Sequence, residues 1–487
     1  MEQYFDKYRR NTIGHDLKMQ SPYGEMNVLY ADWVASGRLY LPIEQKIQEK
    51  FGPWVANTHT ETSETGTIMT KSYHWAHQII KNHVNANEDD ILITSGNGMT
   101  GVINKFQRIL GMKSCGILSR NECIHEEDKR PIVFITHMEH HSNQTSWLET
   151  NADVVVLEPN PDLTVNPEEL KKQLEIYKNR KFKIGSFSSC SNVTGVYTDH
   201  HLLAKIMHQH GGLCFIDFAA NAPYDHMNMH PEDPEEALDA IFFSPHKFLG
   251  GPGSSGVLLF NKELYANSIP DNPGGGTVDW TNPWGEYKYV DNIEAREDGG
   301  TPGFLQAIRI ALAIKLKEEI GVDKIKERED YLVKRAFELL TPIPRLKILS
   351  GDIKDRLGVF SFYMENIHYN LVVKILNDRF GIQVRGGCAC AGTYGHFLMG
   401  ITPEVSEKIV KKISNGDLSS KPGWVRLSLH PTMTNSELDL VATALRELSE
   451  NIDEWEKDYK YNPKNNEFKH LLEVGDKIDI VKSWFEF

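Results

Sequence analysis

The segment AIFFSPHKFLGGPGSSGVLLF, residues 240–260, decides how the rest of the chain is interpreted. Two apolar runs of β-forming residues flank a turn that is rich in glycine and serine. Lys247 therefore stands at the end of a predicted strand, where the backbone can approach closely and a bound molecule can reach the amine. A desolvated amine can be neutral and nucleophilic. The alternative is a solvated surface lysine, which is the commoner case for an isolated lysine.

Strand-like runs alternate with helical segments on the N-terminal side of this segment. The alternation predicts an α/β fold with a largely parallel sheet between helices. Ligands of such sheets bind beyond the carboxyl ends of the strands. Five predicted strand ends carry polar or glycine-rich sequence, namely those at Gly98, His140, Asn192, Asp217 and Lys247. We therefore expect these positions to share one binding site.

Length, composition, net charge and cysteine count limit the kind of protein that the chain can be. With 487 residues, 40% of them hydrophobic and 25% charged, it is long enough for two or three globular domains. The net charge of −14 disfavours nucleic acid or an anionic membrane as a partner. No apolar run approaches the ~20 residues of a membrane helix, and the polar N-terminus does not resemble a secretory signal. Six cysteines are too few for a disulfide framework, so the cytoplasm is the expected compartment.

Changes in sequence pattern divide the chain into four expected segments. Residues 1–27 form a polar N-terminal arm on the side of the smaller domain, and residues 28–324 form the large domain. Residues 325–452 form a smaller domain, and residues 453–487 form a charged and aromatic C-terminal extension. Residues 115–130 lack clear periodicity and are interpreted as a loop inserted into the large domain.

A strand-end lysine, a strand-end carboxylate and a glycine-containing turn together point to pyridoxal phosphate (PLP). This cofactor needs a lysine for its aldehyde and a carboxylate that keeps its ring nitrogen protonated. The turn around Gly98 lies between a predicted strand and a predicted helix, and such a turn presents N–H groups to a phosphate. Asp217 precedes Lys247 by 30 residues. Without these companions, Asp217 would be interpreted as a helix cap.

Six motifs occur in the order typical of one enzyme family. They are MEHHSN (138–143), SNVTG (191–195), Asp217, SPHK (244–247), GTP (300–302) and RGGCAC (385–390). With these motifs, residues 28–450 resemble the class V aminotransferase superfamily, and within it the branch of cysteine desulfurases and selenocysteine lyases. The resemblance implies the PLP-dependent transferase fold of the aspartate aminotransferase type. Its large domain has a mainly parallel seven-stranded sheet between helices, and its smaller domain is α+β.

The resemblance also implies roles for individual residues. Lys247 would be the attachment point of PLP and a proton carrier, and Asp217 would bind the pyridinium nitrogen. His140 would stack on the cofactor ring and take part in proton transfer, whereas His141 is interpreted as a surface or supporting residue. The other implied cofactor contacts are Asn192, Gly98, Met99, Ser244 and His246, together with Thr301, which would reach the neighbouring subunit of a homodimer.

The substrate side of the site involves three further residues. Arg426 resembles the guanidinium that clamps the α-carboxylate of the substrate, which is a task suited to a bidentate donor. Arg385 and His59 are the other expected substrate contacts, and His59 is chosen because it stands in a polar loop rich in hydroxyl groups.

Cys390 stands five residues after Arg385, where similar desulfurases carry their nucleophilic cysteine. A thiolate there would attack the sulfur of the substrate, leaving alanine and an enzyme persulfide. Two alternatives remain for the pair of cysteines: Cys388 could be a redox or persulfide relay partner, or both could be small packing residues. A metal site is not expected, because the two cysteines and nearby His396 form an incomplete ligand set.

The chain departs from the family pattern at two cofactor contacts. Ala220 occupies the position of a glutamine that contacts the cofactor oxygen, and Asn221 is a candidate to replace it. The usual threonine of the phosphate turn is also replaced, because the turn reads Gly98-Met99-Thr100. These departures affect the expected substrate more than the expected cofactor.

The expected function is that of a PLP-dependent C–S lyase. The first hypothesis is an L-cysteine desulfurase that forms L-alanine and a persulfide on Cys390, with a sulfur-acceptor protein as a further partner. The alternative is another class V reaction: transamination, epimerisation or C–S cleavage of a modified cysteine. A third hypothesis, a non-catalytic scaffold or sulfur-trafficking protein, is disfavoured because Lys247, Asp217, His140 and Arg426 are all present.

Overall fold

The computed structural model describes residues 1–58, 60–113, 130–472 and 477–486. His59 and nearly all of the expected loop at 115–130 therefore lie outside the described residues. Within the described residues, no helix is long and apolar enough to cross a membrane.

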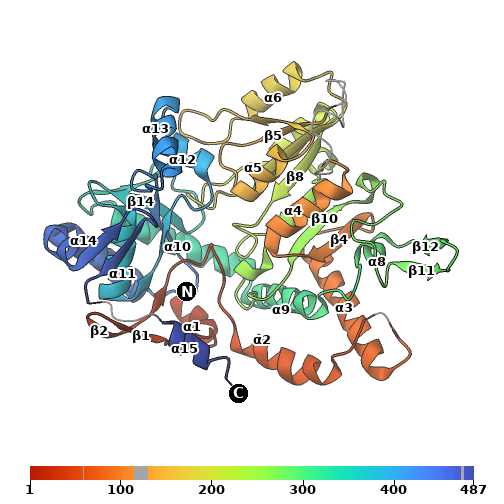
Figure 1. Cartoon of the computed structure of the whole chain (residues 1–487), viewed down its shortest axis with the longest axis horizontal. Helices are drawn as coiled ribbons and strands as arrows, with labels where there is room; N and C mark the ends of the chain where they lie inside the picture. Colours follow the sequence, from red (N-terminus) through yellow and green to blue (C-terminus); the bar gives the residue numbers. More distant parts are fainter. Residues whose placement is uncertain (59, 114–129, 473–476, 487) are drawn as a thin grey trace.

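A seven-stranded sheet lies at the centre of the larger part of the molecule (Figure 1). Its strands are β4 (Asp90–Ser95), β5 (Ile132–Ile135), β6 (Asp153–Val156), β7 (Lys183–Ser188), β8 (Leu213–Asp217), β9 (Ala240–Phe243) and β10 (Gly256–Asn261). They are arranged in the order β4-β10-β9-β8-β7-β5-β6. β10 runs antiparallel to β4 and β9, whereas the pairs between β9 and β6 are parallel. The expected mainly parallel seven-stranded α/β fold is confirmed.

The segment around Lys247 packs on both faces of this sheet. Ile241 and Phe243 belong to one hydrophobic core, and Phe242 belongs to the core on the opposite face. This alternation follows from the two-residue period of a strand, and a strand buried on both faces is apolar throughout. The turn between β9 and β10 folds back tightly, because a Cβ atom on Gly251 would lie 1.8 Å from the Pro245 carbonyl oxygen. A residue other than glycine would therefore displace the backbone beside Lys247.

Helices cover both faces of the sheet. They are α2 (Leu41–Lys46), α3 (Glu64–His83), α4 (Gly98–Ile109), α5 (His141–Leu148), α6 (Pro167–Ile176), α7 (His200–Gln209), α8 (Ile293–Glu297) and α9 (Phe304–Ile320). Phe106 of α4 and Trp147 of α5 pack into one core. Leu174 of α6, Leu203 of α7 and Ile314 of α9 pack into the core on the other face. Helices on both faces leave the strand ends as the accessible edge of the sheet.

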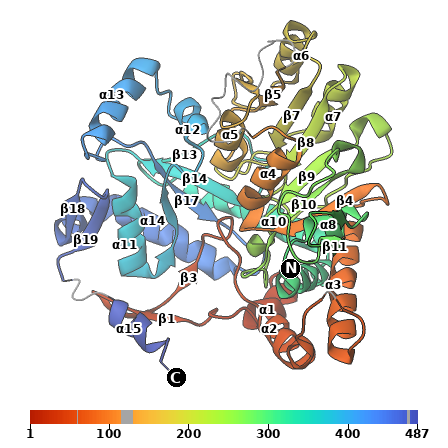
Figure 2. The ribbon, with the colours of Figure 1, turned by 45° about the vertical axis from the view of Figure 1, so that its right-hand side comes forward.

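A four-stranded antiparallel sheet organises the smaller part (Figure 2). Its elements are α10 (Val322–Leu340), β13 (Leu346–Ile348), β14 (Val359–Met364), α11 (Tyr369–Phe380), β15 (Ile382–Gln383), β16 (Arg385–Gly387), α12 (Gly392–Leu398), α13 (Pro403–Ser414), β17 (Trp424–Ser428) and α14 (Asn435–Trp455). The strand order is β13-β14-β17-β16. Its own core contains Phe360 of β14, Ile375 of α11 and Leu445 of α14. The predicted division near residue 325 would fall in the first turn of α10.

Both ends of the chain pack against these two parts. The N-terminal elements are α1 (Glu2–Arg10), β1 (Lys18–Ser21), β2 (Gly24–Asn27) and β3 (Leu29–Tyr30), and the C-terminal ones are β18 (Tyr459–Asn462), β19 (Glu467–His470) and α15 (Ile478–Ser483). Arg9 of α1 forms an ion pair with Glu437 of α14, and β3 pairs with β15. Asn466 donates a hydrogen bond to the Tyr369 hydroxyl of α11. The two ends thus complete the smaller part of the fold.

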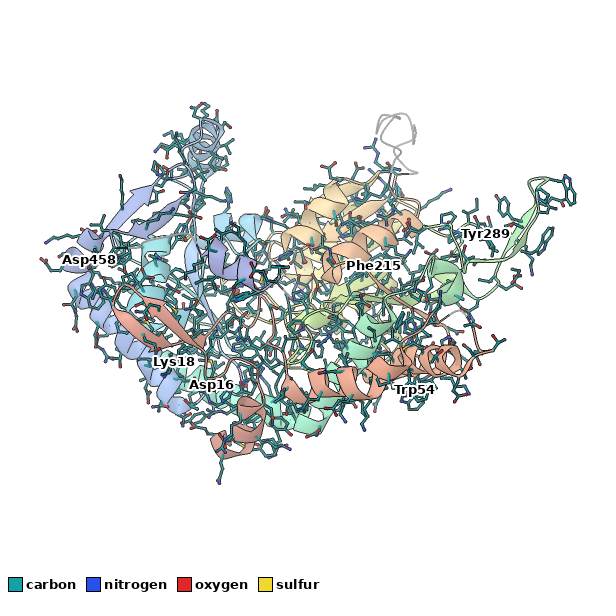
Figure 3. The ribbon with its side chains drawn as sticks, turned by 60° about the horizontal axis from the view of Figure 1, so that its bottom comes forward. Asp16, Lys18, Trp54, Phe215, Tyr289 and Asp458 are labelled. Carbon is teal, nitrogen blue, oxygen red and sulfur yellow. The ribbon has the colours of Figure 1, made fainter. Side chains whose placement is uncertain are left out.

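The segment between β10 and α8 contains a β-hairpin that the sequence analysis did not predict. Its strands are β11 (Val278–Thr281) and β12 (Tyr287–Tyr289), and the side chain of Asn282 accepts hydrogen bonds from two backbone N–H groups in the turn. Both strands are short and rich in β-branched or aromatic residues. Figure 3 shows Tyr289 on this hairpin, which projects away from the sheet that carries Phe215.

Candidate active site

A cavity of about 210 Å³ lies where the strand ends of the large sheet meet β16 and β17 of the smaller part. Its lining contains nearly all of the predicted site residues: Lys247, Asp217, His140, Asn192, Gly98, Met99, Ser244, His246, Arg426, Arg385 and Cys390. In sequence these residues extend from position 98 to position 426. The parallel sheet brings the strand ends together, as expected, and the smaller part supplies the opposite wall.

Lys247 and Asp217 form the floor of this cavity. Lys247 ends a short helical turn that follows β9, and burial lowers the pKa of its amine to about 8, an effect that the Asp217 carboxylate opposes. Asp217 ends β8, is 5% exposed, and accepts a hydrogen bond from the Ala219 N–H at 2.8 Å. Burial raises the pKa of its carboxyl to about 7, an effect that Lys247 opposes. A cation in contact with Asp217 would stabilise the charged carboxylate.

The turn at the start of α4 is shaped for an anion. Gly98 has a φ of +66°, and a Cβ atom there would lie 2.9 Å from the Ser244 hydroxyl oxygen. Met99 donates its backbone N–H to the same oxygen at 2.8 Å. In the described structure, the side chain of the N-cap residue Asn97 caps none of the first N–H groups of α4. The N-terminal end of the helix therefore faces the cavity with N–H groups available to an anion.

His140 is held as a neutral imidazole at the N-terminus of α5. Its Nδ1 accepts the Ser142 N–H at 3.1 Å, which assigns the proton to Nε2. Burial, reinforced by the positive charge of Lys247, lowers the pKa of His140 to about 3. His246 is also neutral, because burial lowers its pKa to about 4. Both rings can therefore pack on a ligand or donate a hydrogen bond without adding charge.

Two arginines of the smaller part share one carboxylate that the sequence analysis missed. Arg426 of β17 donates to Asp32 Oδ1 at 2.8 Å, and Arg385 of β16 donates to Asp32 Oδ2 at 3.0 Å. Arg426 is 3% exposed, whereas nearly half of the Arg385 side chain is accessible. Asp32 follows β3, so a carboxylate at a strand end was the only signal available. It orients both guanidinium groups toward the cavity wall.

Cys390 lies in a strained turn at the mouth of the cavity. Ala391 donates its N–H to the Cys388 carbonyl at 3.0 Å, and the two central residues, Ala389 and Cys390, have φ values of +49° and +57°. Two positive φ values define a primed turn, which normally contains asparagine and glycine. For residues with side chains this conformation costs about 1–2 kcal/mol each. The turn presents Cys390 as an exposed side chain that lines the cavity.

Asn192 and Asn221 have hydrogen-bond partners other than those expected, whereas the expected contact of Thr301 was with a neighbouring subunit. The side-chain amide of Asn192 donates to the Ala389 carbonyl at 2.8 Å, so it contacts the turn of Cys390. Thr301 is exposed between α8 and α9, outside the described lining of the cavity. Ala220 lines the wall, but the amide of Asn221 bonds to Ser189 and Asp225, so it does not support the suggested replacement of the missing glutamine.

Polar residues that support the site also escaped the sequence analysis. Glu139 is 1% exposed and accepts hydrogen bonds from Thr136, Asn143 and Ser188, which tie α5 to the end of β7. Burial raises the pKa of Glu139 above its usual range. This network fixes the backbone that carries His140. The sequence analysis quoted Glu139 only as part of the motif at 138–143. Its hydrogen-bond partners lie up to 49 residues away in the sequence, so no local pattern connects them with Glu139.

The family of the chain follows from comparison with known proteins. The family model of the class-V aminotransferases matches residues 29–441. The chain belongs to the class-V aminotransferase family. The match covers the large sheet, the smaller sheet and every residue of the cavity lining, so the expected resemblance to this superfamily is confirmed.

Relatives within the class-V aminotransferase family share its fold. A protein of Halalkalibacterium halodurans named probable cysteine desulfurase is 28% identical over 390 residues, which are 77% of this chain and 88% of the relative. A Staphylococcus aureus protein of the same name is 29% identical over 74% of this chain and 83% of the relative. The structure of a cysteine desulfurase from Thermococcus onnurineus NA1 aligns with a TM-score of 0.72 at 22% identity, over 91% of this chain and 98% of that one.

Enzymes of the class-V aminotransferase family use PLP, and the cavity fits that group on three counts. Lys247 offers a partly desolvated amine with a lowered pKa. Asp217 is a buried carboxyl that a pyridinium N–H would stabilise. The first N–H groups of α4, with Ser244 beside them, form a cradle that a Cβ atom at Gly98 would fill. Amine, carboxylate and anion site are therefore all present in one cavity.

Proposed function

We propose that the chain is a PLP-dependent L-cysteine desulfurase that releases L-alanine and keeps the sulfur as a persulfide on Cys390. The observation that carries this proposal is that exposed Cys390 lines the same cavity as Lys247 and Arg426. A scaffold protein would not need a strained turn that presents a thiol to a buried amine. The names of the relatives in Halalkalibacterium halodurans and Staphylococcus aureus support the same reaction.

Each residue of the cavity has its own task in the proposed reaction. PLP, when bound, supplies an electron sink for the carbon atoms of the substrate. Arg426, with Arg385 beside it, binds the α-carboxylate, and Asp32 keeps both guanidinium groups in place. Lys247 has a lowered pKa, so near neutral pH its Nζ can both accept and donate a proton at the α-carbon. His140 is neutral because its pKa is lowered, so it would pack against the PLP ring without adding charge and could donate a hydrogen bond from Nε2.

Cys390 takes the sulfur in this scheme. Its thiolate Sγ attacks the sulfur of the bound cysteine, so that an S–S bond forms as the Cβ–S bond breaks. The electron pair of the broken bond stays with carbon, which is later protonated to give the methyl group of alanine. The product on the enzyme is a persulfide, which a reductant or a sulfur-acceptor protein then removes.

The test is incubation of the PLP-loaded chain with L-cysteine and a reductant, with alanine and sulfide measured together. We expect equal amounts of the two products, because each turnover moves one sulfur atom to Cys390 before reduction releases it. Mercaptopyruvate without sulfide would indicate transamination, because that reaction removes the amino group and leaves the C–S bond intact, and pyruvate in place of alanine would indicate elimination. Either result would contradict the desulfurase proposal.

We also propose that the chain forms a homodimer. The domain limits that the sequence analysis placed at residues 28–324 and 325–452 are part of the same proposal. Thr301 is exposed and precedes the start of α9, and the family resemblance implies that it contacts the anion site of a second copy. Sedimentation equilibrium would measure the mass of the assembly. A monomer that retains full activity would remove this part of the proposal without affecting the reaction.

Replacing Arg426 with lysine should weaken substrate binding more than it slows chemistry. Lysine keeps the charge but loses the bidentate contact, so we expect KM for L-cysteine to rise about 10- to 100-fold. Arg385→Lys is the matched control, and its effect should be smaller because Arg385 is far more exposed. Steady-state kinetics on both variants checks this. Equal effects, or a loss confined to kcat, would contradict the assignment of Arg426 as the main clamp.

A further inference from the structure

The turn that carries Cys390 is held by the N-terminal turn of α5. We call residues 388–393 the Cys390 loop. His141 donates its backbone N–H to the Cys390 carbonyl at 2.7 Å, and Gly392 donates its N–H to the His141 ring at Nε2, at 2.9 Å. Thr393 adds a hydrogen bond to Gln144 at 2.9 Å. His141, the residue next to His140 in sequence, therefore holds the loop at Cys390 itself and again two residues further on, at Gly392.

The contact with Gly392 requires a neutral ring. A backbone N–H can only donate, so Nε2 of His141 must carry a lone pair and the proton of the neutral ring must be on Nδ1. A protonated ring carries N–H groups at both nitrogens and would face the Gly392 N–H with a second donor. Protonation of His141 therefore removes this hydrogen bond and replaces it with a repulsive contact.

The Cys390 loop needs such support because of its conformation. Ala389 and Cys390 both adopt positive φ values, which side-chain-bearing residues rarely take up without external contacts. Three side chains of the large part supply those contacts: the Asn192 amide binds the Ala389 carbonyl, and His141 and Gln144 bind the residues that follow. When one contact is lost, the strain favours a relaxed loop.

We propose that His141 is a positioning residue that, while its ring is neutral, holds the Cys390 loop at the cavity and, when protonated, releases it. The consequence for sulfur transfer rests on the proposed function, whereas the holding of the loop does not. In the held state the thiol stays at the cavity wall, where the substrate sulfur would be. In the released state Cys390 moves with its loop away from that wall, where a persulfide is accessible to an acceptor.

The charged groups around His141 favour the held state at neutral pH. Burial lowers the pKa of His141, and the ammonium group of Lys421 lowers it further. His140 lies beside it with a ring-centroid separation of 6.3 Å and is itself neutral. The loop contributes the Cys390 thiol, and α12 contributes His396, whose Nδ1 lies 2.8 Å from the Gly392 carbonyl oxygen. Release is therefore expected only when the pH falls below this lowered pKa.

The test compares His141→Ala with His141→Gln in the full PLP-loaded chain. The amide oxygen of glutamine can accept the Gly392 N–H but does not titrate, whereas alanine accepts nothing. Two readouts are used: hydrogen exchange of peptides covering residues 388–396, and the rate at which iodoacetamide alkylates Cys390, with the labelled peptide identified by mass spectrometry. His74→Gln on the exposed surface of α3 is the matched control.

We expect His141→Ala to raise both the exchange and the alkylation rate several-fold at pH 7.5, once exchange is corrected for its intrinsic pH dependence. In wild type and in His74→Gln, hydrogen exchange of the 388–396 peptides should be slow at pH 7.5 and should rise by a similar factor when the pH is lowered. In His141→Gln, exchange of the same peptides should stay slow at every pH. Slow exchange in His141→Ala would overturn the proposal. If that variant fails to fold, an acid response that persists in His141→Gln would overturn it. Failure to form alanine would refute only the proposed function, because both readouts are independent of turnover.

Discussion

Lys247→Ala should replace the absorbance band of lysine-attached PLP with that of unattached PLP and should abolish the turnover of L-cysteine. The substitution removes the amine that attaches the cofactor and that moves protons at the substrate carbon. We expect kcat/KM to fall by on the order of 10³-fold or more, since proton transfer by a positioned group alone contributes about 10²- to 10⁴-fold. Absorbance spectroscopy before and after addition of L-cysteine, with product assays, measures both effects.

Lys181→Ala provides the control for this substitution. Lys181 is exposed on the loop before β7, so its removal should leave the spectrum and the rate unchanged. Free PLP should still enter the cavity of the Lys247→Ala chain, because Asp217 and the start of α4 are untouched. A Lys247→Ala chain that keeps its spectral shift and turns over within about tenfold of wild type would show that this amine is not the attachment point.

Cys390→Ala should separate cofactor chemistry from sulfur transfer. Without the thiolate no persulfide can form, so we expect sulfide release to fall by on the order of 10³-fold or more, while the visible absorbance and its response to L-cysteine persist. Cys390→Ser should behave in the same way, because a hydroxyl is a poor nucleophile near neutral pH. Mass spectrometry of the protein after one turnover identifies which cysteine gains a sulfur atom.

Cys388→Ala is the matched variant in the same loop. Cys388 lies outside the described lining of the cavity, whereas Cys390 is part of it. We therefore expect Cys388→Ala to form the persulfide in its first turnover, and any relay role of Cys388 to appear only as slower transfer in later turnovers. A persulfide on Cys388 in the Cys390→Ala chain would reverse this assignment of the nucleophile.

The floor of the site could be predicted from sequence because each of its residues terminates a strand. Asp217 ends β8 and Lys247 follows β9, and parallel strands place their carboxyl ends at one edge regardless of their distance along the chain. Local pattern alone therefore brought Gly98, His140 and Lys247 together. The family resemblance then added Arg426 and Cys390, which lie on the opposite wall and which no periodicity connects to the strand ends.

The remaining features depend on contacts that have no local signal. Asp32 binds Arg385 across 353 residues, and the His141 ring binds Gly392 across 251 residues. A single sequence shows that Asp32 follows a short apolar run, but not which cation lies beside it. The hairpin at 278–289 was missed because its strands are short and lie between proline, asparagine and glycine residues, which are typical of loops.

The ion pair between Asp32 and Arg426 has a consequence for the order of assembly during synthesis. All seven strands of the large sheet lie between residues 90 and 261, so this sheet, with Asp217, Lys247 and the start of α4, is complete in the first part of the emerging chain. Asp32 emerges earlier than any of them, but its partner Arg426 follows 394 residues later. On the ribosome the substrate clamp therefore closes last, after the cofactor-binding half has had time to fold.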